Sequence, residues 1–400
     1  MLAKTFSAIP FGYQGQLIEI EGDTQQGLPA FNLVGLAHKS VSEARERVRS
    51  ALKNSGFSFP TRKLTINLAP AEHPKVGTFL DLGIAINILI LSNQLLQSDV
   101  VHKFFVGELS LDGSLRPIRG IINILETAKA SGFTEVYLPK DNLTQAHLIS
   151  NLKLFGVDNL TTVFRHLKQQ IVIPPSIPNV VKNTKTDTNT PVLDHIRGQT
   201  FAKRALAIAV AGRHNLLLSG PPGSGKTLLA QVATNLLPPL NPAEQIAITK
   251  LHSLSGITDQ IIYHRPFRRP HHSSSLTALI GGGIQAVPGE ISLAHLGVLF
   301  LDELPEYPRH LLEALRQPLE DHIISISRVH HKITYPADFM LIATMNPCPC
   351  GFFKDPTHPC TCTPTQIANY QKKLSGPLLD RIDLRVHLQR VNNTDLLQSL

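Results

Sequence analysis

Cysteine is missing from almost the whole chain, and apolar runs long enough to cross a membrane are missing altogether. All four cysteines lie in residues 348–362, so disulfides cannot staple the remainder of this 400-residue chain. The longest apolar run, residues 80–91, contains an Asp and an Asn and is shorter than the roughly 20 residues of a membrane span. The N-terminal stretch MLAKTFSAIPFGYQGQ lacks the apolar segment of a signal peptide. These absences predict a soluble, cytoplasmic protein, in which clustered cysteines favour metal or redox chemistry.

Acidic residues are scarcer than basic ones, and this imbalance sets the charge of the chain. The 30 Asp and Glu residues against 38 Lys and Arg give a net charge of +8 and a pI near 9.3. Such a charge permits a polyanionic partner such as nucleic acid. Charge alone does not identify that partner, because many basic proteins never bind DNA.

A stretch without helical or strand periodicity divides the chain. Residues 169–191 are rich in Pro, Asn, Thr and Lys, which is typical of an exposed linker. We expect one domain over residues 1–168 and a second over residues 192–390. Residues 391–400 follow the second domain.

The first domain alternates strands and helices. Residues 39–55 and 121–131 have the apolar spacing of amphipathic helices. Residues 63–70 and 134–139 predict strands, and residues 104–118 predict a hairpin that turns at an Asp-Gly pair. The pattern predicts an α+β domain.

The second domain contains a glycine-rich loop between an apolar strand and the start of a helix, in the stretch NLLLSGPPGSGKTLLA. It satisfies the pattern GxxxxGK[ST], in which backbone N–H groups wrap a β-phosphate that a Cβ would keep away. Lys226 is expected to reach the β/γ oxygens, and Thr227 to hold Mg²⁺. The nucleotide-binding residues predicted from this pattern are Gly220, Pro221, Pro222, Gly223, Ser224, Gly225, Lys226, Thr227 and Leu228.

Two further strands end in polar residues that a hydrolytic site needs. The run GVLFLDEL ends in Asp302, the expected Mg²⁺ ligand, and Glu303, the expected general base for water. The run FMLIATMN ends in Asn346, which can orient that water or contact a γ-phosphate. The alternative for the acidic pair is a strand that ends in two solvated carboxylates.

These elements resemble the AAA+ ATPases, in which a P-loop domain is built on a parallel sheet. The stretch IRGQTFAKRALAIAVAG resembles the AAA+ segment that lies along the adenine. The resemblance therefore implies nucleotide contacts from Ile196, Gly198 and Gln199.

The stretch SGPLLDRIDL resembles the AAA+ segment that carries the arginine finger. The resemblance implies that Arg381 enters the active site of a neighbouring subunit, where a cation offsets charge on the γ-phosphate. It also implies a homo-oligomer, expected to be a closed hexameric ring. The alternative for Arg381 is an ion pair with Asp380 or Asp383.

Four further stretches indicate which family of AAA+ ATPases the chain resembles. RPFRRPHHSSSLTALIGGG, PGEISLAHLGVLFLDELPEY, LLEALRQPLEDHIISISR and MNPCPCG resemble the magnesium chelatase subunit I family, and within it the bacterial branch called ComM or YifB. Members of that branch are described as hexameric helicases that promote DNA branch migration during natural transformation. The resemblance therefore implies an ATP- and Mg²⁺-dependent DNA translocase that acts in recombination.

The first domain resembles the proteolytic domain of Lon proteases, which shares its fold with a domain of ribosomal protein S5. The resemblance rests on the order of elements in residues 107–139. Phe79 stands where Lon has its nucleophilic Ser, and Ile122 stands where Lon has the partner Lys. Because a Ser-Lys dyad needs a hydroxyl beside an amine, proteolysis is not expected. A scaffold or assembly role and a DNA-contacting role are the remaining interpretations.

The stretch HIISISRVHHKITYP predicts two strands around a basic tip. Related helicases carry an inserted hairpin at this position that lines the pore of the ring. The tip residues would contact phosphates without sequence preference, so their binding would depend on salt. The alternative is a solvated charged turn. The predicted DNA-binding residues are Arg328, His330, His331 and Lys332.

The four cysteines begin two residues after Asn346 and form two CxC pairs, which nine residues separate. Two such pairs can close one tetrahedral thiolate site, for which Zn²⁺ is the best match. A structural zinc site formed by Cys348, Cys350, Cys360 and Cys362 is therefore predicted. A redox switch or free thiols are the alternatives.

Two other functions remain as alternatives to a DNA translocase. One is a chelatase-type ATPase that remodels a protein partner. The other is a nucleotide-binding scaffold without turnover, because AAA+ modules continue into a helical lid of which residues 391–400 are only the expected beginning.

Overall fold

The computed structural model describes residues 2–35, 43–72, 75, 77–178, 193–283, 286–327 and 332–390. The chain divides into two units, and the first consists of Met1–Val181 together with Thr249–Ile261. The second consists of Lys182–Ile248 and Ile262–Leu400. The sequence predicted domains over residues 1–168 and 192–390. It did not predict that Thr249–Ile261, from the middle of the chain, belongs to the first unit.

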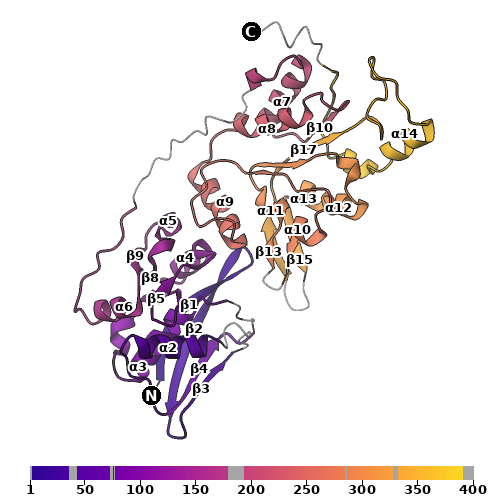
Figure 1. Ribbon diagram of the computed structural model, residues 1–400. Coiled ribbons are helices and arrows are strands. Elements are labelled where there is room, and N and C mark those ends of the chain that lie inside the picture. Colours follow the sequence, from indigo (N-terminus) through magenta and orange to yellow (C-terminus); the bar gives the residue numbers. More distant parts are fainter. Residues whose placement is uncertain are drawn as a thin grey trace. The chain divides into compact units, whose positions relative to one another are not determined.

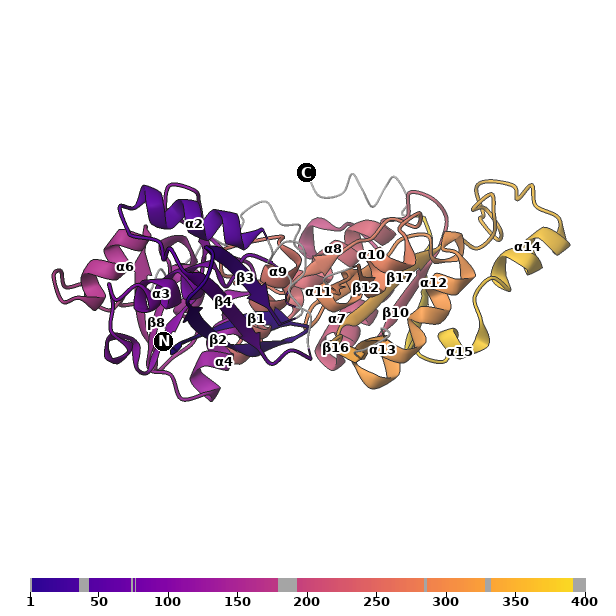
Figure 2. The same ribbon diagram turned by 90° about the horizontal axis from the view of Figure 1, so that it is seen from below.

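Two sheets and the helices around them build the first unit. The larger sheet has the order β1-β2-β4-β3 and the smaller, parallel one the order β5-β8-β9. Figures 1 and 2 show the four strands of the larger sheet next to one another. The strands are β1 (Leu2–Phe11), β2 (Gln14–Gln25), β3 (Ala30–Val34), β4 (Lys63–Ala69), β5 (Lys103–Phe105), β8 (Glu135–Pro139) and β9 (Lys153–Val157). The helices are α2 (Ala44–Asn54), α3 (Asp81–Leu91), α4 (Ile121–Ala130), α5 (Leu143–Ala146) and α6 (Leu160–Leu167), with short 3₁₀ turns at Gln97–Val100 and Lys140–Asn142.

The predicted elements of this unit are confirmed where the structure describes them. A shorter hairpin than the predicted 104–118 forms from β6 (Glu108–Leu109) and β7 (Leu115–Arg116), which pair antiparallel, while residues 104 and 105 belong to β5 of the parallel sheet. Helix α2 covers most of the first predicted helix, although residues 39–42 lie outside the described part of the chain. The unit is therefore α+β, as expected.

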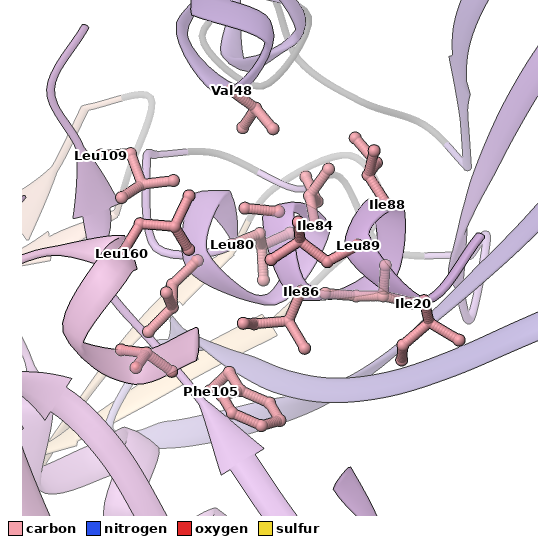
Figure 3. Packing of buried hydrophobic residues seen from close by; sticks show 14 of the residues in the cluster. Ile20, Val48, Leu80, Ile84, Ile86, Ile88, Leu89, Phe105, Leu109 and Leu160 are labelled. Carbon is pink, nitrogen blue, oxygen red and sulfur yellow. The ribbon is translucent and has the colours of Figure 1, made fainter. Parts of the chain in front are cut away.

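Helix α3 forms the centre of the first core. Every residue of Asp81–Leu91 is buried, because α2 packs on it from one side and strands β1 and β2 from another. Figure 3 shows its apolar side chains meeting those of neighbouring elements. The amide of Asn87 donates to the backbone oxygens of Ala3 (3.1 Å) and Ile20 (2.9 Å), so the buried polar group also holds the helix to the sheet.

The segment Thr249–Ile261 is fixed within the first unit by a buried hydroxyl. Ser253 accepts a hydrogen bond from the backbone N–H of Gly120 (3.1 Å) and donates one to the side chain of Gln145 (2.9 Å). Lys250 pairs with Glu126. These contacts explain why the end of helix α9 (Pro242–Ser255) belongs to this unit.

A five-stranded parallel sheet of order β11-β14-β17-β10-β18 carries the second unit. Its strands are β10 (Leu216–Ser219), β11 (Phe267–Arg268), β14 (Val298–Leu301), β17 (Met340–Met345) and β18 (Leu384–His387). The helices are α7 (Thr200–Gly212), α8 (Lys226–Leu236), α10 (Leu276–Ile280), α11 (Glu290–Leu293), α12 (Arg309–Ala314), α13 (Arg316–Asp321), α14 (Pro364–Gln371) and α15 (Gly376–Leu379), with 3₁₀ turns at Leu193–His195 and Leu304–Glu306. Two hairpins complete the unit: β12 (Gly281–Gly282) with β13 (Val287–Pro288), and β15 (Ile323–Ser327) with β16 (Lys332–Pro336).

Helices cover both faces of this sheet. Alternate strand residues such as Leu218 and Phe300 pack in one cluster with α7 and α8. Their neighbours Leu217 and Leu301 pack in a second cluster with α12 on the opposite face. Figure 1 shows α7 and α8 on one side of β10 and β17, and α12 and α13 on the other. The arrangement has three layers, and continuous apolar runs follow because both faces are buried.

Among the described residues, no helix combines the length and the apolar character that crossing a membrane requires.

His295 fixes the chain just before β14. Its Nδ1 accepts the backbone N–H of Asp338 at 3.1 Å, and the N–H of Leu296 donates to the carbonyl of Asp338 at 2.6 Å. Burial lowers the pKa of His295 to about 4. The neutral ring is therefore the form that fits, because a proton on Nδ1 would face the N–H of Asp338.

We expect acid to destabilise the second unit through His295. Its pKa is lower in the folded state (about 4) than the ordinary 6.5, so its stabilising contribution is present above pH 6.5 and is lost as pH falls toward 4. Between pH 7.5 and 4.5 this loss amounts to about 2 to 3 kcal/mol. Urea unfolding at both pH values, followed by hydrogen exchange in β14 and β17, measures it.

The variant His295→Asn keeps an acceptor at this position and removes the titration. Its second unit should lose less stability on acidification than that of the unaltered chain. The exposed His358→Asn serves as the control and should behave like the unaltered chain. An equal pH dependence for His295→Asn and the unaltered chain would contradict the explanation.

Candidate nucleotide site and cysteine cluster

The glycine-rich loop lies between β10 and α8, as expected. Gly223 and Gly225 have φ angles of 77° and 88°, in the region that disfavours side chains. A Cβ on Gly220 would stand 2.6 Å from the carbonyl oxygen of Leu388, so only glycine fits there. Helix α8 begins at Lys226, which places its N-terminus at the loop. Unblocked backbone and a helix N-terminus suit an anionic phosphate.

Lys226 connects this loop with the residue that follows β17. Its ammonium donates to the carbonyls of Gly220 (2.7 Å) and Pro221 (3.0 Å), and to the side-chain oxygen of Asn346 (3.2 Å). Burial lowers the pKa of Lys226, and the nearby carboxylates of Asp302 and Glu303 act in the opposite direction. The structure thus brings together the lysine and the asparagine that two distant motifs predicted.

The expected metal ligands also meet. The hydroxyl of Thr227 lies 3.5 Å from a carboxylate oxygen of Asp302, at the end of β14. A hydroxyl and a carboxylate at the edge of a phosphate site fit the ligands that Mg²⁺ takes in P-loop proteins. Glu303 follows with an exposed side chain and a φ of 53°, a conformation that costs a non-glycine residue free energy.

Two residues of this site were missed from the sequence. Thr344, on β17, donates to Asp302 at 2.6 Å and accepts the backbone N–H of Glu303 at 2.9 Å, so one hydroxyl holds the carboxylate of Asp302 and the backbone of Glu303. Arg269 donates to the other oxygen of Asp302 at 2.6 Å. Arg269 lies in one of the family stretches, but that stretch does not indicate a contact with Asp302. A polar residue in the middle of the apolar run FMLIATMN was the available signal for Thr344.

Ion pairs and hydrogen bonds hold the other arginines of the loop around Arg269. Arg268 makes two hydrogen bonds of 2.6 Å with Glu290. The buried guanidinium of Arg265 donates to the carbonyl of Leu296 at 2.7 Å and pairs with Glu244. These cations are therefore engaged within the unit.

The segment expected along the adenine reaches the glycine-rich loop through Gln199. The amide of Gln199 donates to the carbonyls of Ser224 (3.1 Å) and Gln389 (2.6 Å). Gly198 is exposed with a φ of 60°, whereas Ile196 is buried in the core beneath α7. An adenine contact from these three residues stays a prediction.

Arg381 follows the short helix α15 and pairs with Glu320, not with either of the neighbouring aspartates considered above. About a third of its side chain is exposed (34%), so a neighbouring subunit can reach it. Its role as a finger stays a prediction.

The expected basic hairpin forms from β15 and β16, paired from Ile323 with Pro336 to Ser327 with Lys332. Lys332 is exposed at the start of β16. Arg328, His330 and His331 lie outside the described residues. Buried Tyr335 anchors the hairpin by donating to the carbonyl of Ala286 at 2.6 Å.

The four cysteines converge, as the spacing predicted. Their sulfur atoms all lie within 4.8 Å of one another. The cluster is able to hold a metal ion. Cys348 is buried, and the other three cysteines are partly exposed.

Comparison with known proteins agrees with this geometry. Residues 192–396 match the family model "Magnesium chelatase, subunit ChlI", and residues 20–142 match "Subunit ChlI of Mg-chelatase". Competence protein ComM of Haemophilus influenzae is 46% identical over 97% of this chain and 76% of its own length. YifB of Escherichia coli is 44% identical over 94% of this chain and 74% of its own length. The 67 kDa magnesium-chelatase subunit of Heliobacterium mobile is 28% identical over 40% of this chain.

The chain belongs to the ComM/YifB family. Its second unit is an AAA+ domain, which the parallel sheet and the match to the chelatase model both support. It is a ComM-type AAA+ ATPase, and that class uses ATP and Mg²⁺. The first unit holds Phe79 and a fully buried Ile122 where a Lon dyad would require Ser and Lys.

We expect Thr344→Val to reduce ATP hydrolysis about 10- to 100-fold, because the carboxylate of Asp302 and the backbone of Glu303 both lose the hydroxyl that holds them. ADP affinity without Mg²⁺ should change little, since Thr344 touches no part of the glycine-rich loop in the described contacts. Steady-state hydrolysis and ADP titration measure the two effects. Thr344→Ser retains the hydroxyl and should stay near the unaltered rate. Hydrolysis by Thr344→Val at the unaltered rate would show that the hydroxyl is dispensable.

Proposed function

We propose that this protein is the motor of a hexameric, ATP-driven DNA translocase that promotes branch migration in natural transformation and recombination. The observation that carries the proposal is the convergence of Lys226, Thr227, Asp302 and Asn346 in a chain that is 46% identical to a competence protein. The net charge of +8 is compatible with a polyanionic track.

The chemistry assigned to the chain's own residues follows from their positions. Gly220–Gly225 and Lys226 would bind the phosphates, while Thr227 and Asp302 would hold the Mg²⁺ that offsets phosphate charge. Glu303 would take the proton of the attacking water, with Asn346 orienting that water. Thr344 holds the carboxylate of Asp302 and the backbone of Glu303.

The hairpin β15–β16 is the proposed DNA contact. It is a rigid antiparallel pair, since Ile324, Ile333 and Tyr335 are buried on the face toward the unit. In the sequence, Arg328, His330 and His331 lie between the two strands and Lys332 begins β16, and these cations would meet phosphates without reading bases.

Arg381 is proposed to act on the nucleotide of an adjacent subunit. In the isolated chain its guanidinium is paired with Glu320, so it would exchange one anion for another on assembly. This assignment makes hydrolysis dependent on the ring.

Two inactive variants should restore each other if the finger acts in trans. Glu303→Gln keeps the finger but lacks the base, and Arg381→Ala keeps the base but lacks the finger; each should lose at least about a hundredfold in hydrolysis. In a random equal mixture, about a quarter of the interfaces would pair a working base with a working finger. The mixture should hydrolyse ATP measurably, whereas Lys372→Ala, which removes an exposed cation directly after α14, should be unaffected. A mixture as inactive as its components would contradict action in trans.

DNA should stimulate ATP hydrolysis, and the hairpin should transmit the stimulation. Arg328→Ala with Lys332→Ala should remove most of it while leaving the DNA-free rate unchanged, because neither residue belongs to the nucleotide site. Hydrolysis with and without forked DNA, at two salt concentrations, measures the effect. Lys53→Ala with Arg62→Ala removes the same charge from exposed positions of the first unit and is the control.

The outcomes also separate the alternative functions. Hydrolysis that does not respond to DNA would favour a chelatase-type ATPase acting on a protein partner, to which the partial match with the Heliobacterium subunit points. Equal and negligible rates for Glu303→Gln and the unaltered chain would favour a scaffold without turnover.

A further inference from the structure

The sulfur atoms of the cysteine cluster have the spacing of a tetrahedral metal site. Cys348 and Cys360 are 3.7 Å apart, Cys350 and Cys360 are 3.6 Å apart, and Cys348 and Cys350 are 3.3 Å apart. Four sulfurs at about 2.3 Å from one zinc ion would lie about 3.8 Å from each other. A disulfide would instead require about 2.05 Å. The cysteines are therefore arranged around a common centre and not in bonded pairs.

The backbone around the cluster favours thiolates. The N–H of Cys350 donates to the sulfur of Cys362 at 3.4 Å, and the N–H of Phe353 donates to the sulfur of Cys348 at 3.3 Å. Such outer donors orient thiolate ligands in metal sites. Four sulfurs close the tetrahedron without leaving a place for water, which is the pattern of a structural site.

Little else holds this part of the chain. Between Met345, where β17 ends, and Pro364, where α14 begins, the chain forms no helix or strand. Residues 356–359 at its far end are exposed. A loop of this length in a domain usually needs a constraint, and a metal that joins its two CxC pairs supplies one.

The loop that carries the four cysteines, residues 346–363 (the cysteine loop), lies directly against the glycine-rich loop. A Cβ on Gly351 would stand 2.7 Å from Cδ and 2.8 Å from Cγ of Pro222. Gly351 has a φ of 86° and its N–H donates to the carbonyl of Cys348 at 3.0 Å, so it belongs to the turn that carries the first CxC pair. The position of Pro222 thus depends on the shape of that turn.

Further contacts connect the cysteine loop with other borders of the nucleotide site. Asp355 pairs with Arg390 at 3.3 Å, and the adjacent carbonyl of Gln389 accepts the amide of Gln199. The amide of Gln371 on α14 donates at 3.2 Å to the carbonyl of Pro347, next to Asn346. The loop therefore contacts the glycine-rich loop, the segment after β18 and helix α14.

We propose that Cys348, Cys350, Cys360 and Cys362 bind one zinc ion, and that this metal holds Gly351 against Pro222 and so sets the affinity of the glycine-rich loop for nucleotide. The metal has no part in hydrolysis. It stabilises the glycine-rich loop through the contact of Gly351 with Pro222. The inference rests on the nucleotide site of the proposed function and is independent of DNA.

The test measures zinc content and ADP affinity on the full chain, without DNA. The unaltered chain should contain about one zinc per chain by elemental analysis. Cys360→Ser with Cys362→Ser should contain almost none and bind ADP about tenfold more weakly, a loss of the size that supporting residues produce at such sites. Thr361→Ser, an exposed change between the two cysteines, should match the unaltered chain in both measurements.

A second variant separates support of the loop from general loss of folding. Gly351→Ala keeps all four ligands but would push on Pro222, so it should retain zinc and still bind ADP several-fold more weakly. Unaltered protein without stoichiometric zinc would overturn the proposal. So would a zinc-free variant with ADP affinity within about twofold of the unaltered chain, or Gly351→Ala with full affinity. Failure of the unaltered chain to bind ADP would instead contradict the proposed function.

Discussion

The register of three parallel strands is the constraint on which the nucleotide site depends. Ser219 on β10 pairs with Met345 on β17, and Leu301 on β14 pairs with Ala343. Because parallel strands end at one edge of a sheet, this pairing brings the glycine-rich loop, Asp302 and Asn346 to the same edge. A slip of one residue would turn Thr344 to the opposite face and separate it from both acids.

The polar groups of this edge are already paired with one another before any nucleotide is considered. Lys226 is bound to Asn346 and to loop carbonyls, and Arg269 is bound to Asp302. Nucleotide and metal would therefore exchange existing hydrogen bonds for new ones. This exchange limits the net gain in free energy, because each broken bond offsets part of each bond formed.

Local patterns predicted much of the fold and of the site, and contacts between distant segments account for the remainder. Three features can be recognised from a few consecutive residues: the glycine-rich loop, the acidic end of β14 and the CxC pairs. The roles of Thr344, Arg269 and Glu320 cannot be recognised in this way. They depend on contacts that form only when distant segments of the chain come together in the folded second unit. The segment Thr249–Ile261 could not be assigned for the same reason: Ser253 belongs to the first unit only through Gly120 and Gln145.

The nucleotide site also depends on the cysteine loop, which lies outside the sheet. The loop follows β17 and begins at Asn346, which contacts Lys226, and its Gly351 lies against Pro222 of the glycine-rich loop. Any restraint on the loop therefore acts on two neighbours of the glycine-rich loop at once. Thermodynamic linkage makes such an effect reciprocal: if bound zinc raises the affinity for nucleotide, bound nucleotide must raise the affinity for zinc by the same factor. A site placed here to fix the glycine-rich loop would thus hold its metal most firmly when nucleotide is bound.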